Sequence, residues 1–129
     1  MNIKEKGLTA SEKFVMKAIW DAKEDIAFQE LLRRVKEQYG RDYARTTVAT
    51  FLKNMEEKGF VSSYHIGRTA YIHAEKSEEE YKKQFIQDNT NFWFEGSAGK
   101  VMAALFETQD ITKDEICKMR KMLDELEEK

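Results

Sequence analysis

Three threonines at helical spacing are the residues of this sequence best suited to contact another molecule. They lie in a predicted helix over residues 44–58, whose polar face consists of Thr46, Thr47, Thr50, Lys53 and Asn54. Threonine is a poor helix former, so three of them on one exposed face indicate a binding role. A threonine hydroxyl can donate to or accept from a base edge, and its methyl group can touch that of thymine. The face therefore predicts contact with bases in a DNA major groove.

The charges around this face also suit a nucleic acid. The face has no carboxylate before Glu57, near the helix end, so nothing earlier on it repels phosphates. Arg45, at the helix start, can reach a base edge or a phosphate, and Lys53 is expected to bind a phosphate. The free N–H groups at the start of the helix attract phosphate as well. Arg68 lies at the tip of a predicted hairpin, where we expect it to meet the phosphate backbone or the minor groove.

The elements that must position this face can be predicted from periodicity and turn residues. Helices are expected over residues 11–21, 28–39 and 44–58, with a short extended stretch at 25–27. Two β-rich runs at 60–66 and 69–73 flank Gly67 and Arg68, which predicts a hairpin. This order is that of a winged helix-turn-helix. The apolar face of the third helix, which carries Val48, Phe51, Leu52 and Met55, is expected to pack on the first two helices.

The remainder of the chain is predicted to be helical. Helices are expected over residues 78–91, over 98–107, and from about 113 to near the C-terminus. Capping boxes are predicted at Thr9–Glu12, Ser77–Glu80 and Thr112–Glu115. The fold class is thus mainly α (α+β), with a winged-helix DNA-binding domain over residues 1–76 and a helical dimerisation region over residues 77–129.

The large apolar groups of the last three helices indicate a dimer. These helices carry more apolar surface than three short helices can bury by themselves, and a second copy in a two-fold dimer can supply the missing surface. The alternative is that they fold back onto the winged domain as one monomeric core. The residues expected to form the dimer contact are Phe85, Phe92, Val101, Leu105, Ile116, Met119, Leu123 and Leu126.

Composition excludes several other classes of protein. The net charge of −2 is divided unevenly, with +3 over residues 1–76 and −5 over residues 77–129, which favours different roles for the two parts. No apolar run is long enough to span a membrane or to act as a signal peptide, so we expect a cytoplasmic protein without direct membrane binding. Cys117 is the single cysteine and is expected to be a small apolar residue on a helix. His65 and His73 are interpreted as structural, since no metal-ligand spacing accompanies them.

No catalytic arrangement, phosphate loop or metal cluster can be identified, so an enzyme is the least favoured class and no cofactor is expected. Two alternatives to an operator-binding repressor stay open. One is a winged helix released from DNA by a small molecule bound near Phe92, Trp93 and Phe94. The other is a winged helix that binds only protein.

Several ordered stretches resemble the penicillinase repressor family, which includes the BlaI and MecI repressors and, as cousins, the copper repressors. The resemblance is carried by residues 8–20, by 46–50 followed by 58–61, and by 66–71 followed by 77–81; it extends more weakly through 111–126. It implies a homodimer that binds a palindromic double-stranded DNA operator through an N-terminal winged helix.

The resemblance also implies a means of relief from repression. In such families a membrane-bound sensor protease, often one that detects a β-lactam, triggers cleavage of the repressor. The family's scissile pair is typically Asn-Phe, and the corresponding residues here are Leu105 and Phe106. Lys13 and Asn54 stand where members of the family often carry Trp and Arg. The copper-repressor branch carries a Cys-x-Cys motif, whereas this chain has only Cys117, so copper sensing is not expected.

Overall fold

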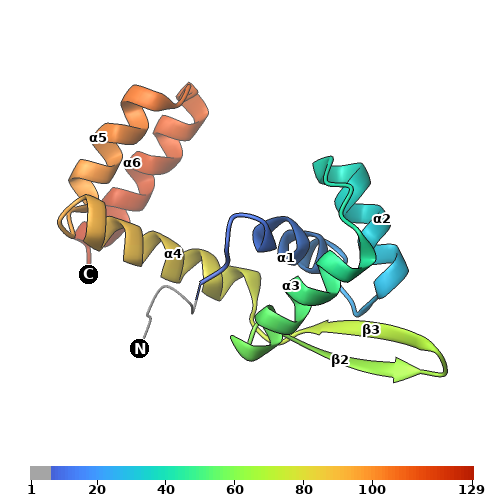
Figure 1. Ribbon diagram of the computed structural model, residues 1–129. Helices are drawn as coiled ribbons and strands as arrows, with labels where there is room; N and C mark the ends of the chain where they lie inside the picture. The colour runs from blue at the N-terminus through green and yellow to red at the C-terminus, as the bar shows by residue number, and fades with distance from the viewer. Residues whose placement is uncertain (1–6) are drawn as a thin grey trace. The chain divides into compact units, whose positions relative to one another are not determined.

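The structure is a computed structural model that describes residues 7–129. The chain divides into two compact units, of which the first ends at Lys82 and the second begins at Lys83. The first unit contains, in order, α1 (Glu12–Asp21), β1 (Ile26–Ala27), α2 (Phe28–Tyr39), α3 (Arg45–Glu57), β2 (Val61–Ile66) and β3 (Thr69–Ala74) (Figure 1). This is the order predicted for a winged helix-turn-helix, so the fold class is confirmed.

A small antiparallel sheet holds the hairpin against the helices. The strand order is β1-β3-β2, with Ile26 opposite Ile72 and Ser63 opposite Ile72 on the other side. The hairpin turns at Gly67, whose φ of 62° lies in the left-handed region that favours glycine. Because β1 directly precedes α2, this short strand ties the hairpin to the helical part of the unit.

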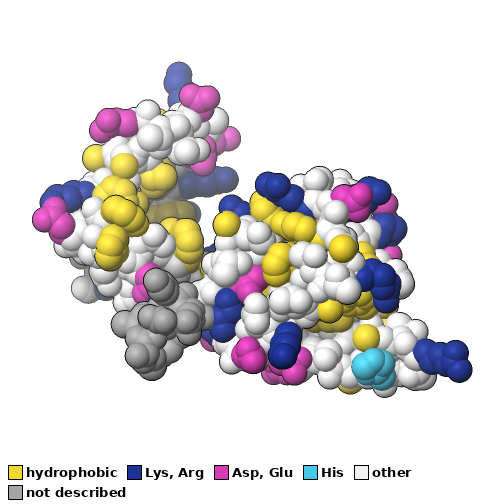
Figure 2. Space-filling view, viewed as in Figure 1, with side chains coloured by type: hydrophobic (Ala, Val, Ile, Leu, Met, Phe, Trp, Pro, Cys, Tyr) yellow, Lys and Arg dark blue, Asp and Glu magenta, His cyan; other side chains and the backbone are white. Residues whose placement is uncertain are grey.

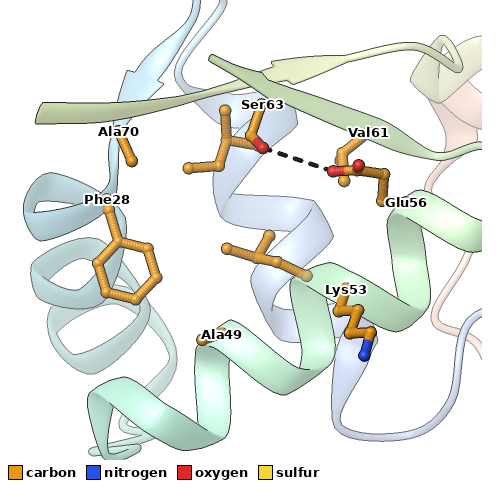
Figure 3. A pocket seen from close by; sticks show the side chains of 9 residues that line it. Phe28, Ala49, Lys53, Glu56, Val61, Ser63 and Ala70 are labelled. Atoms are coloured by element: carbon orange, nitrogen blue, oxygen red, sulfur yellow. Dashed lines mark hydrogen bonds between the residues drawn. The ribbon is translucent and has the colours of Figure 1, made fainter. Parts of the chain in front are cut away.

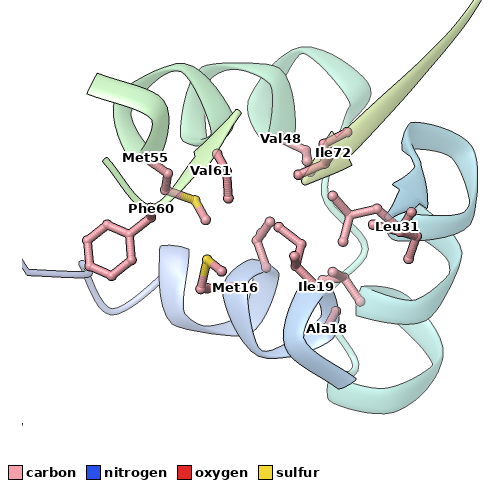
Figure 4. Close-up of a cluster of buried hydrophobic side chains, with 12 residues drawn as sticks. Met16, Ala18, Ile19, Leu31, Val48, Met55, Phe60, Val61 and Ile72 are labelled. Carbon is pink, nitrogen blue, oxygen red and sulfur yellow. The ribbon is translucent and has the colours of Figure 1, made fainter. Parts of the chain in front are cut away.

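The hydrophobic core lies where the three helices meet the sheet (Figure 4). Met16 and Ile19 of α1, Leu31 of α2 and Val48 of α3 are buried together with Ile72 of β3. The predicted apolar face of α3 is confirmed: its members Val48 and Met55 are buried, and Phe51 and Leu52 pack against the core while half-buried. The opposite face of α3 is consequently held outward.

Side-chain caps fix where several helices begin. The predicted box at Thr9 is present, since Glu12 N donates to Thr9 Oγ1 at 3.1 Å and Thr9 N donates to Glu12 Oε1 at 3.0 Å. At Ser77 only half of the predicted box forms. Glu80 N donates to Ser77 Oγ at 3.1 Å, but the Glu80 carboxylate accepts from the Ser77 hydroxyl instead of its backbone N–H.

The rest of the chain forms α4 (Glu78–Trp93), α5 (Ala98–Thr108) and α6 (Lys113–Glu127) (Figure 1). Helix α4 extends two residues further than its predicted end at residue 91. The chain then turns at Glu95 and Gly96, which both have positive φ. The predicted capping box of α6 is confirmed, with both of its hydrogen bonds present between Thr112 and Glu115.

The boundary between the two units falls within α4. The first turn of this helix packs on the winged unit: Lys17 Nζ lies 2.5 Å from Glu78 Oε2, and the ring of Tyr81 lies against those of Trp20 and Phe60. Trp20 Nε1 also donates to the carbonyl oxygen of Lys76 at 2.9 Å. These contacts explain why the first unit continues to residue 82.

The helices of the second part carry no buried side chain. None of the residues in α4, α5 or α6 is buried in the single chain. Phe92 and Trp93 are 75% and 70% exposed, and Figure 2 shows hydrophobic side chains gathered on the visible surface of this unit. Cys117 is exposed on α6, so it does not fill the role of a buried apolar residue in the single chain.

All eight residues predicted to form the dimer contact are on these three helices and are exposed or half-buried in the single chain. They are Phe85 and Phe92 of α4, Val101 and Leu105 of α5, and Ile116, Met119, Leu123 and Leu126 of α6.

Candidate nucleic-acid interface

The outward face of α3 places the predicted contact residues together. Thr46, Thr50, Lys53 and Asn54 are exposed, while Thr47 is half-buried. Since α3 begins at Arg45, the two threonines Thr46 and Thr50 stand one turn apart on the same side of the helix. The predicted face of the first unit is therefore accessible to another molecule.

The start of α3 is electropositive and has no cap from a side chain. Its N-cap is Ala44, which makes no side-chain hydrogen bond, and its first turn contains no acidic residue. The N–H groups of the first turn and the helix dipole therefore attract an anion. Arg45 extends this charge, and its guanidinium lies 5.0 Å from the centre of the Phe28 ring. This cation–π contact orients the Arg45 side chain beside the helix start.

The cations of the first unit fall into two groups. Arg33 pairs with Glu30 and Glu37 along α2, Arg34 pairs with Glu30, and Lys58 pairs with Glu12. In contrast, Arg45, Lys53 and Arg68 form no ion pair with any residue between 7 and 129. The three predicted phosphate contacts thus keep their charges available for a ligand.

An open cleft of about 390 Å³ separates α3 from the sheet (Figure 3). Its floor is apolar, and its lining consists of Phe28, Ala49, Leu52, Lys53, Glu56, Val61, Ser63, Ala70 and Ile72. Glu56 closes one end, where the Ser63 hydroxyl donates to its carboxylate at 3.4 Å. This carboxylate points toward β2 (Figure 3), so it lies beside the threonine face and not on it.

The hairpin projects beyond the helices and ends in a basic tip. Arg68 directly follows the Gly67 turn and is exposed, and Figure 2 shows basic side-chain atoms at the far end of the hairpin. Ile66, on the other side of the turn, is 63% exposed. An exposed isoleucine at this tip was not predicted, although its position directly before Gly67 in the sequence could have indicated it.

A carboxylate braces the hairpin from the turn that follows α1. The Tyr64 hydroxyl donates to Asp25 Oδ2 at 2.5 Å, and His73 Nδ1 lies 2.7 Å from Asp25 Oδ1. Tyr64 also stacks on Tyr71, with ring centroids 5.7 Å apart. The hydrogen bonds from Tyr64 and then from His73 lower the pKa of Asp25, and the hydrogen bond to Asp25 raises the pKa of His73.

Arg41 is a candidate contact residue that sequence reasoning missed. It lies in the turn between α2 and α3, directly after Gly40, and is exposed. Its guanidinium lies 4.4 Å from the centre of the Phe14 ring, which orients it without neutralising it. The signal available in the sequence was an arginine in the turn of a helix-turn-helix, four residues before Arg45.

Neither a metal site nor a membrane-spanning helix accompanies this interface in the described residues. Between residues 7 and 129 no group of three or more His, Cys, Asp or Glu side chains is placed to hold a metal ion. No helix in this described part is long and apolar enough to cross a membrane.

The chain is similar to a known family of proteins over most of its length. A family model described as penicillinase repressor matches residues 8–125, which is nearly the whole chain and includes both units. No curated protein matches the chain.

Proposed function

This chain belongs to the penicillinase repressor family, a family of DNA-binding transcriptional repressors, and from that premise we propose that it binds a palindromic operator as a homodimer. The observation that carries the proposal is that the cations around the threonine face form no ion pair with any residue between 7 and 129. Arg45 and Lys53 flank Thr46 and Thr50 on α3, and Arg68 stands at the hairpin tip.

In the proposed complex, α3 lies in the major groove. Thr47 and Thr50 come near the bases, whereas Arg45, Lys53 and Arg68 bind phosphates. Thr46 and Asn54 complete the face toward the groove. The hairpin tip then reaches the adjacent minor groove or its phosphates.

The proposed dimer forms through α4, α5 and α6. Three helices without one buried residue cannot account for their own stability, because most helical stability comes from packing of an apolar face. Contact with the same helices of a second copy buries Phe92, Leu123 and Leu126 together with their neighbours. The two winged units then bind half-sites about 34 Å apart, one turn of the duplex.

Relief of repression is proposed to follow cleavage of the dimer region by a membrane-bound sensor protease that responds to a cell-wall antibiotic. The proposed site is the bond between Leu105 and Phe106, two exposed residues of α5. A protease requires an extended substrate, and α5 has no buried residue that would oppose its local unwinding. Such a repressor would work in the cytoplasm, where its operator lies.

The proposal is tested by selecting duplexes from a random DNA library with the full chain and measuring binding by fluorescence anisotropy at two salt concentrations. We expect one palindrome to be enriched, with affinity falling steeply as salt rises. Lys53→Gln should reduce that salt dependence, whereas Arg33→Gln, which removes the same charge from a paired site, should leave it nearly unchanged. The absence of any enriched duplex would favour a winged helix that binds protein.

A further inference from the structure

The hydroxyl of Thr50 is already engaged as a donor within α3. Thr50 Oγ1 donates to the backbone carbonyl oxygen of Thr46 at 3.0 Å, one turn earlier in the helix. A hydroxyl has one hydrogen, so the oxygen retains only its capacity to accept. The side chain nevertheless remains exposed at the centre of the threonine face.

The fold favours this arrangement of Thr50. A β-branched side chain inside a helix has few allowed χ1 rotamers, and threonine settles in those that let its oxygen bond a carbonyl three or four residues earlier. Thr46 and Thr50 are both exposed, so burial of this surface against a partner would remove the water that could replace the bond. The hydroxyl hydrogen is therefore expected to stay on the helix in a complex.

The hydroxyl of Thr46, on the same face, keeps its hydrogen available for a partner. No residue between 7 and 129 accepts a hydrogen bond from its hydroxyl, and its side chain is exposed. Its hydroxyl can therefore donate to a partner as well as accept from one. The two threonines have the same side chain, and they differ in what they can present to a base edge.

We propose that Thr50 reads the operator as an acceptor only, so that the group facing its oxygen is the exocyclic amino group of adenine or cytosine. These are the only donors that base pairs present in the major groove, whereas guanine presents N7 and O6, which are acceptors. The methyl group of Thr50 remains free to touch a thymine methyl at the neighbouring position. This inference rests on the proposed function, because it assigns the atoms that the proposed interface contacts.

The test uses the full chain and the duplex that it enriches from the random library. At each adenine or cytosine of one half-site, the amino group is removed with purine or 2-pyrimidinone. At each purine, N7 is removed with a 7-deaza analogue. Affinities are measured by anisotropy for wild type, for Thr50→Val, which keeps the shape and loses the acceptor, and for Thr50→Ser, which keeps the hydroxyl. Thr46→Val is the matched control.

We expect loss of one amino group to weaken wild-type binding by about three- to tenfold, the range for one hydrogen bond between neutral groups. Thr50→Val removes the acceptor from both protomers of the proposed dimer, so it should lose about the square of that factor on the native duplex, roughly ten- to a hundredfold. It should not respond to that analogue, whereas Thr50→Ser and Thr46→Val should still respond. Removal of N7 from any purine should change the affinity of Thr50→Val by the same factor as that of wild type.

Two results would overturn the inference. One is coupling of Thr50 to N7 of a purine, which would mean that the hydroxyl donates. The other is enrichment of a duplex on which Thr50→Val loses no affinity. Failure to enrich any duplex is a different outcome, because it overturns the proposed function itself and this inference with it.

Discussion

Lys58 Nζ, at the C-cap of α3, lies 2.5 Å from Glu12 Oε1 and joins the end of α3 to the start of α1. Glu12 is only 2% exposed, and the same ammonium donates to the carbonyl oxygen of Gly7 at 2.9 Å. Glu12 also closes the capping box with Thr9. One carboxylate therefore fixes the beginning of α1 and the position of α3 relative to it.

Replacing Lys58 with methionine should destabilise the winged unit by about 3 kcal/mol, because a buried carboxylate would lose its charged partner. The free energy of unfolding from urea titration measures this effect. Lys53→Met, an equal change at an exposed lysine of the same helix, should alter stability by less than about 0.5 kcal/mol. Equal losses from the two variants would show that the ion pair with Glu12 contributes nothing specific.

The brace between Asp25 and His73 should make stability depend on pH. The pKa of His73 is raised above its usual 6.5 by the hydrogen bond to Asp25, so its contribution is complete below pH 6.5 and is lost as pH rises through the raised pKa. The pKa of Asp25 is lowered below 3.8 by Tyr64 and His73, so its contribution is lost only as pH falls through that lowered pKa. The brace therefore contributes most to stability between pH 3.8 and pH 6.5.

His73→Gln should accordingly lower the Tm more at about pH 5.5 than at about pH 8.5, in thermal unfolding followed by circular dichroism. His65→Gln is the control, since His65 lies on β2 and makes no side-chain hydrogen bond or ion pair with residues 7–129. Its change in Tm should be the same at both pH values. A His73 effect independent of pH would mean that the pairing with Asp25 stabilises only through neutral hydrogen bonding.

Most of the winged unit could be predicted because its signals are local. The apolar period of α3, the Gly40 cap, whose φ is 65°, and the Thr9 capping box each depend on residues within one or two helical turns. The end of α4 was predicted two residues early, because Phe92 and Trp93 are aromatic residues of modest helix propensity that precede Gly96. Here the helix continues until backbone with positive φ ends it.

The sequence could predict which residues share the polar face of α3, but not which cations around it are neutralised by ion pairs. Which cations are neutralised depends in part on pairs far apart in sequence, such as Glu12 with Lys58 and Asp25 with His73. No periodicity reveals such pairs. The donor role of the Thr50 hydroxyl is local, one turn from Thr46, but it becomes informative only once the exposure of both residues is known.

Arg68 should contribute to DNA binding mainly through charge. Arg68→Gln is expected to reduce the slope of log K against log salt concentration by about 1 for each protomer, and to weaken binding similarly on selected and on random duplexes. Anisotropy over a series of salt concentrations measures both quantities. Lys121→Gln, on α6, removes the same charge and should leave the slope unchanged. A loss confined to the selected duplex would mean that Arg68 reads bases.

The proposed dimer should depend on the apolar side of α6 and not on its polar side. Leu123 and Lys121 are both exposed in the single chain and lie on different sides of this helix, since two residues differ by about 200° around its axis. Leu123→Gln removes one apolar contact from each copy, so a two-fold dimer loses two, worth together about 3 kcal/mol.

That loss corresponds to an increase of about a hundredfold in the dimer dissociation constant, measurable by sedimentation equilibrium. Lys121→Gln introduces the same glutamine side chain in the same helical turn and should not change the dimer dissociation constant. Because a monomer carries one winged unit, Leu123→Gln should also weaken operator binding at low protein concentration while affinity for a single half-site stays constant. Unchanged dimerisation in Leu123→Gln would place the contact on α4 or α5 instead, and a monomeric wild type would contradict the dimer altogether.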